Sequence, residues 1–213
     1  MWKFSEVELR FTTPFAASVP KNPKDIEAML VARAPSDAEL RRRKEAGEEI
    51  TPLDELAEQV AEEVEATEEV QRGHATFKRD EKGLYYEARC VRAHIKDCAN
   101  QLQGLLGIKA LKSKVANRVY VKPERIYLDK QEPDGNEVRI VHTITPKGPR
   151  SSLKTIDYVD KPTLKFKLKV LDEGVIDRDI LEAIFEYGGE HGMGQERSQD
   201  WGKYELVKLE EVK

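Results

Sequence analysis

The sequence is poor in the residues that cross-link a chain or bind metal: it has 2 cysteines and 4 histidines among 213 residues. Cys90 and Cys98 lack the spacing of a metal-binding motif, and no second cysteine or histidine cluster completes a zinc site. Without an export signal, we expect both thiols to be reduced. These absences argue against a disulfide framework, and we predict no metal and no cofactor.

The sequence also lacks any run of about 18 apolar residues, which excludes an ordinary membrane-spanning helix. Residues 1–6 lack the apolar core of a signal peptide. We therefore expect a soluble, cytoplasmic protein with no membrane partner. Hydrophobic residues make up 39% of the chain and charged residues 36%, which allows a modest core beneath a strongly ionic surface.

The net charge of −4 conceals two segments of opposite sign. Residues 36–72 hold 13 acidic and 5 basic side chains, a net charge of −8. Residues 88–170 hold 18 basic and 8 acidic side chains, a net charge of +10. A basic segment beside an acidic one is typical of a nucleic-acid surface with a distinct appendage. Charge alone leaves open that both segments are merely solvated faces.

Hydrophobic periodicity predicts a mixture of helices and strands. Alternating apolar residues predict strands at residues 3–12, 163–171 and 203–212, and a hairpin formed by strands 74–82 and 84–93. Apolar residues at helical spacing predict helices at residues 25–33, 93–106 and 176–187.

The acidic segment 35–73 differs in kind from the rest. Ser36 and Glu39 form a capping-box pattern, and Pro52 suits the first position of a second helix. A single narrow apolar stripe runs along that second helix, formed by Leu53, Leu56, Val60 and Val64. We interpret the segment as an inserted helical hairpin whose stripe contacts the parent domain.

The stretch 188–204 contains five of the 13 glycines and joins the last helix to the last strand. Glycine permits positive φ and close approach of a partner, and successive amides in such a loop can bind an anion. Gly188 and Gly189 are interpreted as helix caps, whereas Gly192 and Gly194 are predicted to approach phosphate. The loop is not a Walker motif, because no Gly-Lys-Ser/Thr follows it.

A basic loop at residues 146–154 has one core-forming residue, Leu153. It is interpreted either as a hairpin tip without further function or as a finger on an anionic partner.

The C-terminal order of elements resembles the RAMP superfamily of CRISPR-associated proteins. A strand and a helix precede Gly192-Met193-Gly194, residues 195–200 intervene, and Trp201-Gly202-Lys203-Tyr204 leads into the final strand. Within the superfamily, the chain is most similar to the crRNA-binding backbone subunits of effector complexes. The specific match covers roughly the last 50 residues, and elsewhere only the element order agrees. The usual Gly-aromatic-Gly is Asp200-Trp201-Gly202 in this chain.

The resemblance implies an α+β fold with a ferredoxin-like (RRM-like) core in one domain spanning residues 1–213. The acidic helical insertion at 35–73 and a thumb-like basic hairpin at 138–160 would decorate that core. The implied partners are guide RNA, other effector-complex subunits and further copies of the chain. Contacts to RNA phosphates would position the RNA without reading its sequence. The implied RNA-binding residues are Gly192, Gly194, Arg197, Lys203, Lys96, His94, Arg92, Lys147, Arg150 and Lys154.

Two other functions stay open. RAMP endonucleases that process guide precursors often pair a histidine with a tyrosine or serine, so His191 beside the glycine loop is a candidate general base. Some backbone subunits cleave target RNA with an aspartate in an early loop, but the surroundings of Asp25 do not match that motif. We predict no catalytic residues. The third reading is a protein–protein scaffold of a mobile element that uses the acidic insertion.

Overall fold

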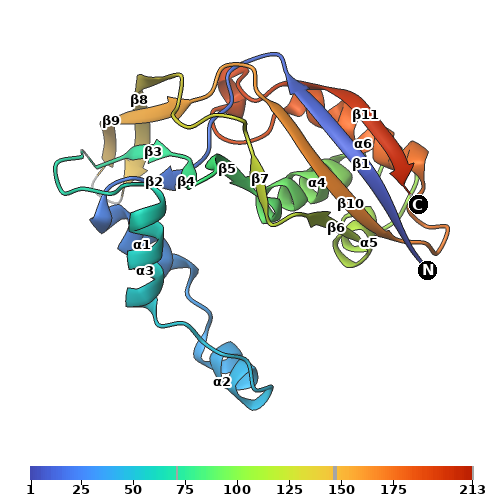
Figure 1. Ribbon diagram of the computed structural model, residues 1–213, viewed down its shortest axis with the longest axis horizontal. Coiled ribbons are helices and arrows are strands. Elements are labelled where there is room, and N and C mark those ends of the chain that lie inside the picture. The colour runs from blue at the N-terminus through green and yellow to red at the C-terminus, as the bar shows by residue number, and fades with distance from the viewer. Residues whose placement is uncertain (71, 146–147, 213) are drawn as a thin grey trace. The chain divides into compact units, whose positions relative to one another are not determined.

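The computed structural model describes residues 1–70, 72–145 and 148–212 (Figure 1). The chain divides into two compact units. Unit 1 comprises Met1–Ala17, Asp80–Gly135 and Tyr158–Lys213. Unit 2 comprises Ser18–Arg79 and Asn136–Asp157. Helices and antiparallel strand pairs occur together, as the predicted α+β class requires.

Unit 1 is built on a four-stranded antiparallel sheet with the strand order β11-β1-β10-β6 (Figure 1). Val7, Leu9 and Phe11 of β1 are buried, because alternate side chains of a strand point to one face. The strands predicted at both ends of the chain and at residues 163–171 are confirmed. The four strands are β1 (Trp2–Phe11), β6 (Val119–Lys122), β10 (Thr163–Leu171) and β11 (Tyr204–Val212).

Two helices cover the face of this sheet on which those buried side chains lie. They are α4 (Ala88–Leu102) and α6 (Arg178–His191), and the ring of Phe185 on α6 lies 6.3 Å from that of Phe166 on β10. Asp177 caps α6, since its carboxylate accepts a hydrogen bond from the Ile180 amide at 2.9 Å. The chain order of these six elements is β1-α4-β6-β10-α6-β11.

Helix α4 begins five residues before the predicted start at residue 93. The predicted strand 84–93 is β5 (Gly83–Glu87) followed directly by α4, and β5 pairs antiparallel with β7 (Arg125–Tyr127). The physical reason lies in the apolar spacing, because Ala88, Val91 and Ile95 already follow the helical repeat and are buried. A shorter helix, α5 (Leu111–Arg118), leads from α4 into β6.

Unit 2 contains three helices, α1 (Pro23–Arg33), α2 (Asp37–Glu45) and α3 (Leu53–Glu63). The helices expected in the acidic segment are therefore present. The apolar stripe of α3 packs on α1, with Val60 and Val64 in one cluster with Ile26, whereas no side chain of α2 is buried. The helical pair is α1 with α3, which corrects the expected pairing of the two helices within the insertion.

The sheet of unit 2 has the strand order β2-β3-β9-β8, and β3 runs parallel to β9. The predicted thumb-like hairpin at 138–160 falls on β8 and β9, but residues 146–147 between them lie outside the described residues. Its role as a thumb stays a prediction. The strands are β2 (Val19–Pro20), β3 (His74–Thr76), β8 (Gly135–Thr145) and β9 (Gly148–Tyr158), and β4 (Lys78–Asp80) follows β3 in the chain.

Candidate nucleic-acid interface

The glycine-rich loop after α6 is packed tightly against its own unit. A β-carbon added to Gly194 would lie 2.3 Å from the carbonyl oxygen of Ala16, and one added to Gly192 would lie 2.7 Å from that of Trp201. Both glycines have positive φ, at +87° and +78°. The fold itself therefore requires glycine at both positions.

Several amides of this loop are used inside the protein. The Gly192 amide donates to the Gly188 carbonyl, that of Met193 to the Gly202 carbonyl and that of Gln195 to the Ala16 carbonyl, each at 2.9 Å. The Gly192 amide is thus not open to a phosphate, which corrects the expectation for this residue. For Gly194 the phosphate contact stays a prediction.

Arg197, in the short 3-10 turn η1 (Arg197–Gln199), is held by Asp97 of α4. Its Nη1 lies 3.1 Å from Asp97 Oδ2 and 2.7 Å from His191 Nε2, and that ring nitrogen lies 3.0 Å from the same carboxylate oxygen. One nitrogen cannot accept from Arg197 and donate to Asp97 at once, so the tautomer of His191 selects between the two bonds. Burial acts to raise the pKa of Asp97, but hydrogen bonds from His191 and Arg197 outweigh it and lower that pKa. Arg197 is therefore a half-exposed cation anchored by a carboxylate.

Lys203 closes the glycine-rich loop. Its Nζ lies 2.9 Å from Asp200 Oδ1 and 3.6 Å from Glu190 Oε2, and the hydrogen bond to Asp200 is the main cause of its raised pKa. The carboxylate partners are 80% and 86% exposed, so these ion pairs contribute little to stability. Lys203 thus keeps a cation at the surface, where a phosphate would compete with the two carboxylates.

His94 does not belong to the interface. The side chain is 7% exposed, and its Nε2 shares a 2.9 Å hydrogen bond with the hydroxyl of Tyr204. Burial lowers the pKa of His94 to about 3, so the imidazole is neutral near pH 7. A buried neutral ring makes no contact with a phosphate, which corrects the prediction for this residue.

Because α4 starts at Ala88, Arg92 and Lys96 lie beyond its first turn rather than at the helix N-terminus. The expected use of orphan helix amides beside them is therefore wrong. Lys96 is half-buried on α4, and its contact with RNA stays a prediction.

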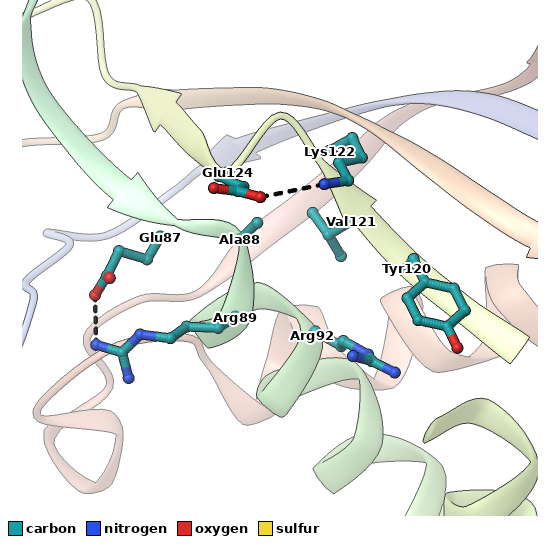
Figure 2. Close-up of a pocket in the computed structure, with 8 residues that line it drawn as sticks. All are labelled: Glu87, Ala88, Arg89, Arg92, Tyr120, Val121, Lys122 and Glu124. Carbon is teal, nitrogen blue, oxygen red and sulfur yellow. Dashed lines mark hydrogen bonds and ion pairs between the residues drawn. The ribbon is translucent and has the colours of Figure 1, made fainter. Parts of the chain in front are cut away.

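Arg92 lines a pocket of about 330 Å³ at the start of α4 (Figure 2). Figure 2 shows Arg89 and Arg92 reaching from α4, with Tyr120 and Lys122 extending from β6. The lining residues are Glu87, Ala88, Arg89, Arg92, Tyr120, Val121, Lys122 and Glu124.

Two of the three cations in this pocket form ion pairs. Arg89 pairs with Glu87 at 2.5 Å, and Lys122 pairs with Glu124 at 3.3 Å. Arg92, by contrast, forms no ion pair within the part of the chain that the structure describes. The pocket therefore carries one uncompensated positive charge.

The guanidinium of Arg92 is held in place by its neighbours, but not all of its N–H donors have an acceptor. It lies 4.4 Å from the centre of the Tyr120 ring and donates one hydrogen bond to the Ala116 carbonyl. Its Nε is buried and has no hydrogen-bond partner among the described atoms. A buried donor without an acceptor costs free energy, so an anionic oxygen in this pocket would be stabilised.

Sequence reasoning missed Arg89, Tyr120 and Lys122. Arg89 lies three residues before Arg92, so the two share a helix face, a relation visible only once the start of α4 is placed correctly. Tyr120 and Lys122 share one face of β6 by simple alternation. No feature of the local sequence indicates that this strand lies beside α4.

Two of the three predicted finger residues, Arg150 and Lys154, belong to β9 of unit 2. Lys154 is half-buried in β9. Arg150 belongs to the same strand, but only its backbone is described. Lys147 lies outside the described residues. Their contact with RNA stays a prediction.

The described ranges contain neither a metal-binding cluster nor a membrane-spanning helix. No group of three or more His, Cys, Asp or Glu side chains there is arranged to hold a metal ion. None of the helices in these ranges has the length and apolarity to cross a membrane.

No protein-family model matches the chain, and no curated protein matches it. Among 77 matching chains of solved structures, one comes from the "Cryo-EM structure of the Type III-B Cmr-beta bound to cognate target RNA". The two chains are 13% identical with a TM-score of 0.47, and the match covers 100% of this chain and 61% of that one. The chain thus spans less than two thirds of that neighbour's length. A likeness at this level decides neither fold nor function.

Proposed function

We propose that this chain is an RNA-binding subunit of a CRISPR-type guide-RNA effector complex, with a ferredoxin-like core in unit 1. The strand order β11-β1-β10-β6 carries the proposal, because it joins the chain order β-α-β-β-α-β with a glycine-rich loop between α6 and β11. This is the arrangement that the resemblance of roughly the last 50 residues to the RAMP superfamily implies.

The chemistry of unit 1 suits the RNA backbone. The Arg92 pocket offers an uncompensated guanidinium, which can bind two phosphate oxygens through its planar fork. Arg197 and Lys203 supply further surface cations beside the glycine-rich loop. Such contacts hold phosphates irrespective of sequence, as a backbone subunit of a guide-RNA complex requires.

The test is RNA binding at two salt concentrations, measured by fluorescence anisotropy with a guide-like RNA and a scrambled RNA of equal length. We expect similar affinities for both, falling roughly twentyfold between about 50 and 200 mM salt if about three phosphates are contacted. Binding no stronger than that of an acidic control protein at low salt would refute the proposal. A discrete RNA that co-purifies with the chain would support it independently.

A second candidate is a guide-processing endoribonuclease, which the Asp97–His191 contact favours. Asp97 Oδ2 lies 3.0 Å from His191 Nε2, an arrangement that can orient an imidazole as a general base. In the tautomer that donates from Nε2 to Asp97, Arg197 bonds to Asp97 Oδ2 at 3.1 Å instead of to the ring, and its charge would stabilise developing negative charge. Incubation of repeat RNA with wild type and His191→Ala distinguishes the two functions, because uncut RNA with both proteins rules cleavage out.

A further inference from the structure

The face of the unit 1 sheet opposite α4 and α6 carries exposed aromatic side chains. Because Val7 and Leu9 of β1 are buried on the helix side, Trp2 and Phe4 lie on the other face. They are 39% and 42% exposed. Two large aromatic residues that remain exposed at alternate positions of one strand form an apolar surface that the described residues of this unit cover only in part.

Strand register places lysines next to these rings. Phe4 lies opposite Lys169, and Lys169 lies opposite Tyr120, so the three residues form a row across β1, β10 and β6. Lys169 Nζ lies 4.5 Å from the centre of the Trp2 ring, and the Trp2 and Tyr120 rings meet edge to face with centroids 5.7 Å apart.

The neighbouring row contains two lysines and one carboxylate. Glu6 lies opposite Lys167, which lies opposite Lys122. The Glu6 carboxylate is shared between Lys167 at 3.8 Å and Lys208 at 2.9 Å. Aromatic rings beside a surplus of lysines suit a partner that carries both negative charge and flat, apolar groups. An unpaired nucleic-acid strand has both properties, whereas an acidic protein helix lacks the flat groups.

The aromatic surface continues into the Arg92 pocket through Tyr120. The Tyr120 ring meets the Trp2 ring edge to face, and the Arg92 guanidinium lies 4.4 Å from the centre of the Tyr120 ring. An RNA strand that binds Arg92 through one phosphate could therefore place its next bases against the aromatic rings of β1.

We propose that Trp2 and Phe4 form a stacking platform for unpaired bases of single-stranded RNA, with Lys169 and Arg92 holding the adjoining phosphates. The inference rests on the proposed function and deepens it, since it names unpaired bases as what unit 1 recognises. Because every base has a flat face, the platform accepts RNA without sequence preference.

The experiment compares a single-stranded RNA of about 12 nucleotides with its perfect duplex, using full-length protein. Trp2→Leu and Phe4→Leu each keep an apolar side chain but remove the ring, and Val207→Ala, which is 47% exposed on β11 in the wild type, is the matched control. We expect each ring variant to bind the single strand at least about fivefold more weakly, with unchanged duplex affinity. Lys169→Gln should reduce the slope of log affinity against log salt, by about 0.7 for one lost phosphate contact, whereas Trp2→Leu should leave it unchanged.

Tryptophan fluorescence gives a second readout that does not depend on any variant. Trp201 is 8% exposed, so quenching on addition of single-stranded RNA reports mainly Trp2. Two results together would overturn the platform while the proposed function stands. They are RNA binding by wild type without quenching of Trp2, and RNA affinity of Trp2→Leu equal to that of wild type. No RNA binding by wild type at low salt would instead defeat the proposed function. Self-association that requires Trp2 and occurs without RNA would show that a second copy covers this face, and would also overturn the platform.

Discussion

Met193 and Gly202 hold the two ends of the glycine-rich loop together. The Met193 amide donates to the Gly202 carbonyl at 2.9 Å, and a β-carbon added to Gly202 would lie 1.9 Å from the Met193 carbonyl oxygen. The Met193 side chain is completely buried. Two backbone segments in contact leave no room for a side chain, so this part of the loop is closed by its own chain rather than open to a ligand.

Gly202→Ala should therefore destabilise the protein by about 2–3 kcal/mol, because it combines backbone strain at φ +75° with a backbone clash. Urea unfolding measures this change. Gly174→Ala is the matched control, since Gly174 has φ +67° but no atom within 4 Å of an added β-carbon. The control should lose only about 1 kcal/mol, and equal losses in both variants would show that the contact with Met193 is unimportant.

Arg92→Gln should weaken RNA binding about tenfold at low salt, because it removes the uncompensated cation of the pocket. Arg92→Lys should recover part of the affinity, since it restores the charge but not the planar fork. The control is Arg10→Gln, which also removes one cation, here one that is paired with Glu205. Arg10 lies near the opposite end of β1, roughly 26 Å along the strand from Trp2, so this variant should change RNA affinity little. Equal losses in Arg92→Gln and Arg10→Gln would show that only overall charge matters.

Acid should destabilise the fold through His94. Burial lowers the pKa of His94 to about 3 from 6.5, so the unfolded chain binds this proton more readily than the folded one. The stability that His94 contributes is complete above pH 6.5 and is lost as the pH falls from there toward the folded pKa. We expect the free energy of unfolding to decrease by about 2 kcal/mol between pH 7.5 and 5 through this group.

The matched variant for this pH effect is His94→Gln, which keeps a polar group near Tyr204 but cannot titrate. Urea titrations of both proteins above pH 5 should show a flatter pH dependence for the variant. Parallel curves would mean that other groups cause the acid sensitivity.

Replacement of residues 36–50 by a short glycine–serine linker should leave stability within about 1 kcal/mol, because α2 buries no side chain. Val60→Asp should instead cost about 3 kcal/mol, since it places a carboxylate in the cluster with Ile26. Thermal unfolding compares the two. RNA affinity should persist in the linker variant, and a loss of subunit assembly with intact RNA binding would favour the scaffold function.

Several elements were predictable because their signal is local. In β10, Leu164, Phe166, Leu168 and Val170 alternate with lysines, and the structure buries all four. The start of α4 was harder to predict, because a short, mainly apolar stretch such as residues 84–91, interrupted by Glu87 and Arg89, fits either a strand or a helix until its neighbours are known.

The sequence by itself determined the alternating strands, the capped helices, the separation of acidic from basic segments and the concentration of glycines, because periodicity and residue preference act over a few neighbouring residues. Only the tertiary structure decided which charges are neutralised and what each glycine faces. Gly194 meets Ala16, and Arg197 meets Asp97, through folding that joins distant parts of the chain. The glycine-rich loop therefore serves packing as well as any RNA contact, and in the pocket beside α4 it is Arg92 that forms no ion pair with a described residue.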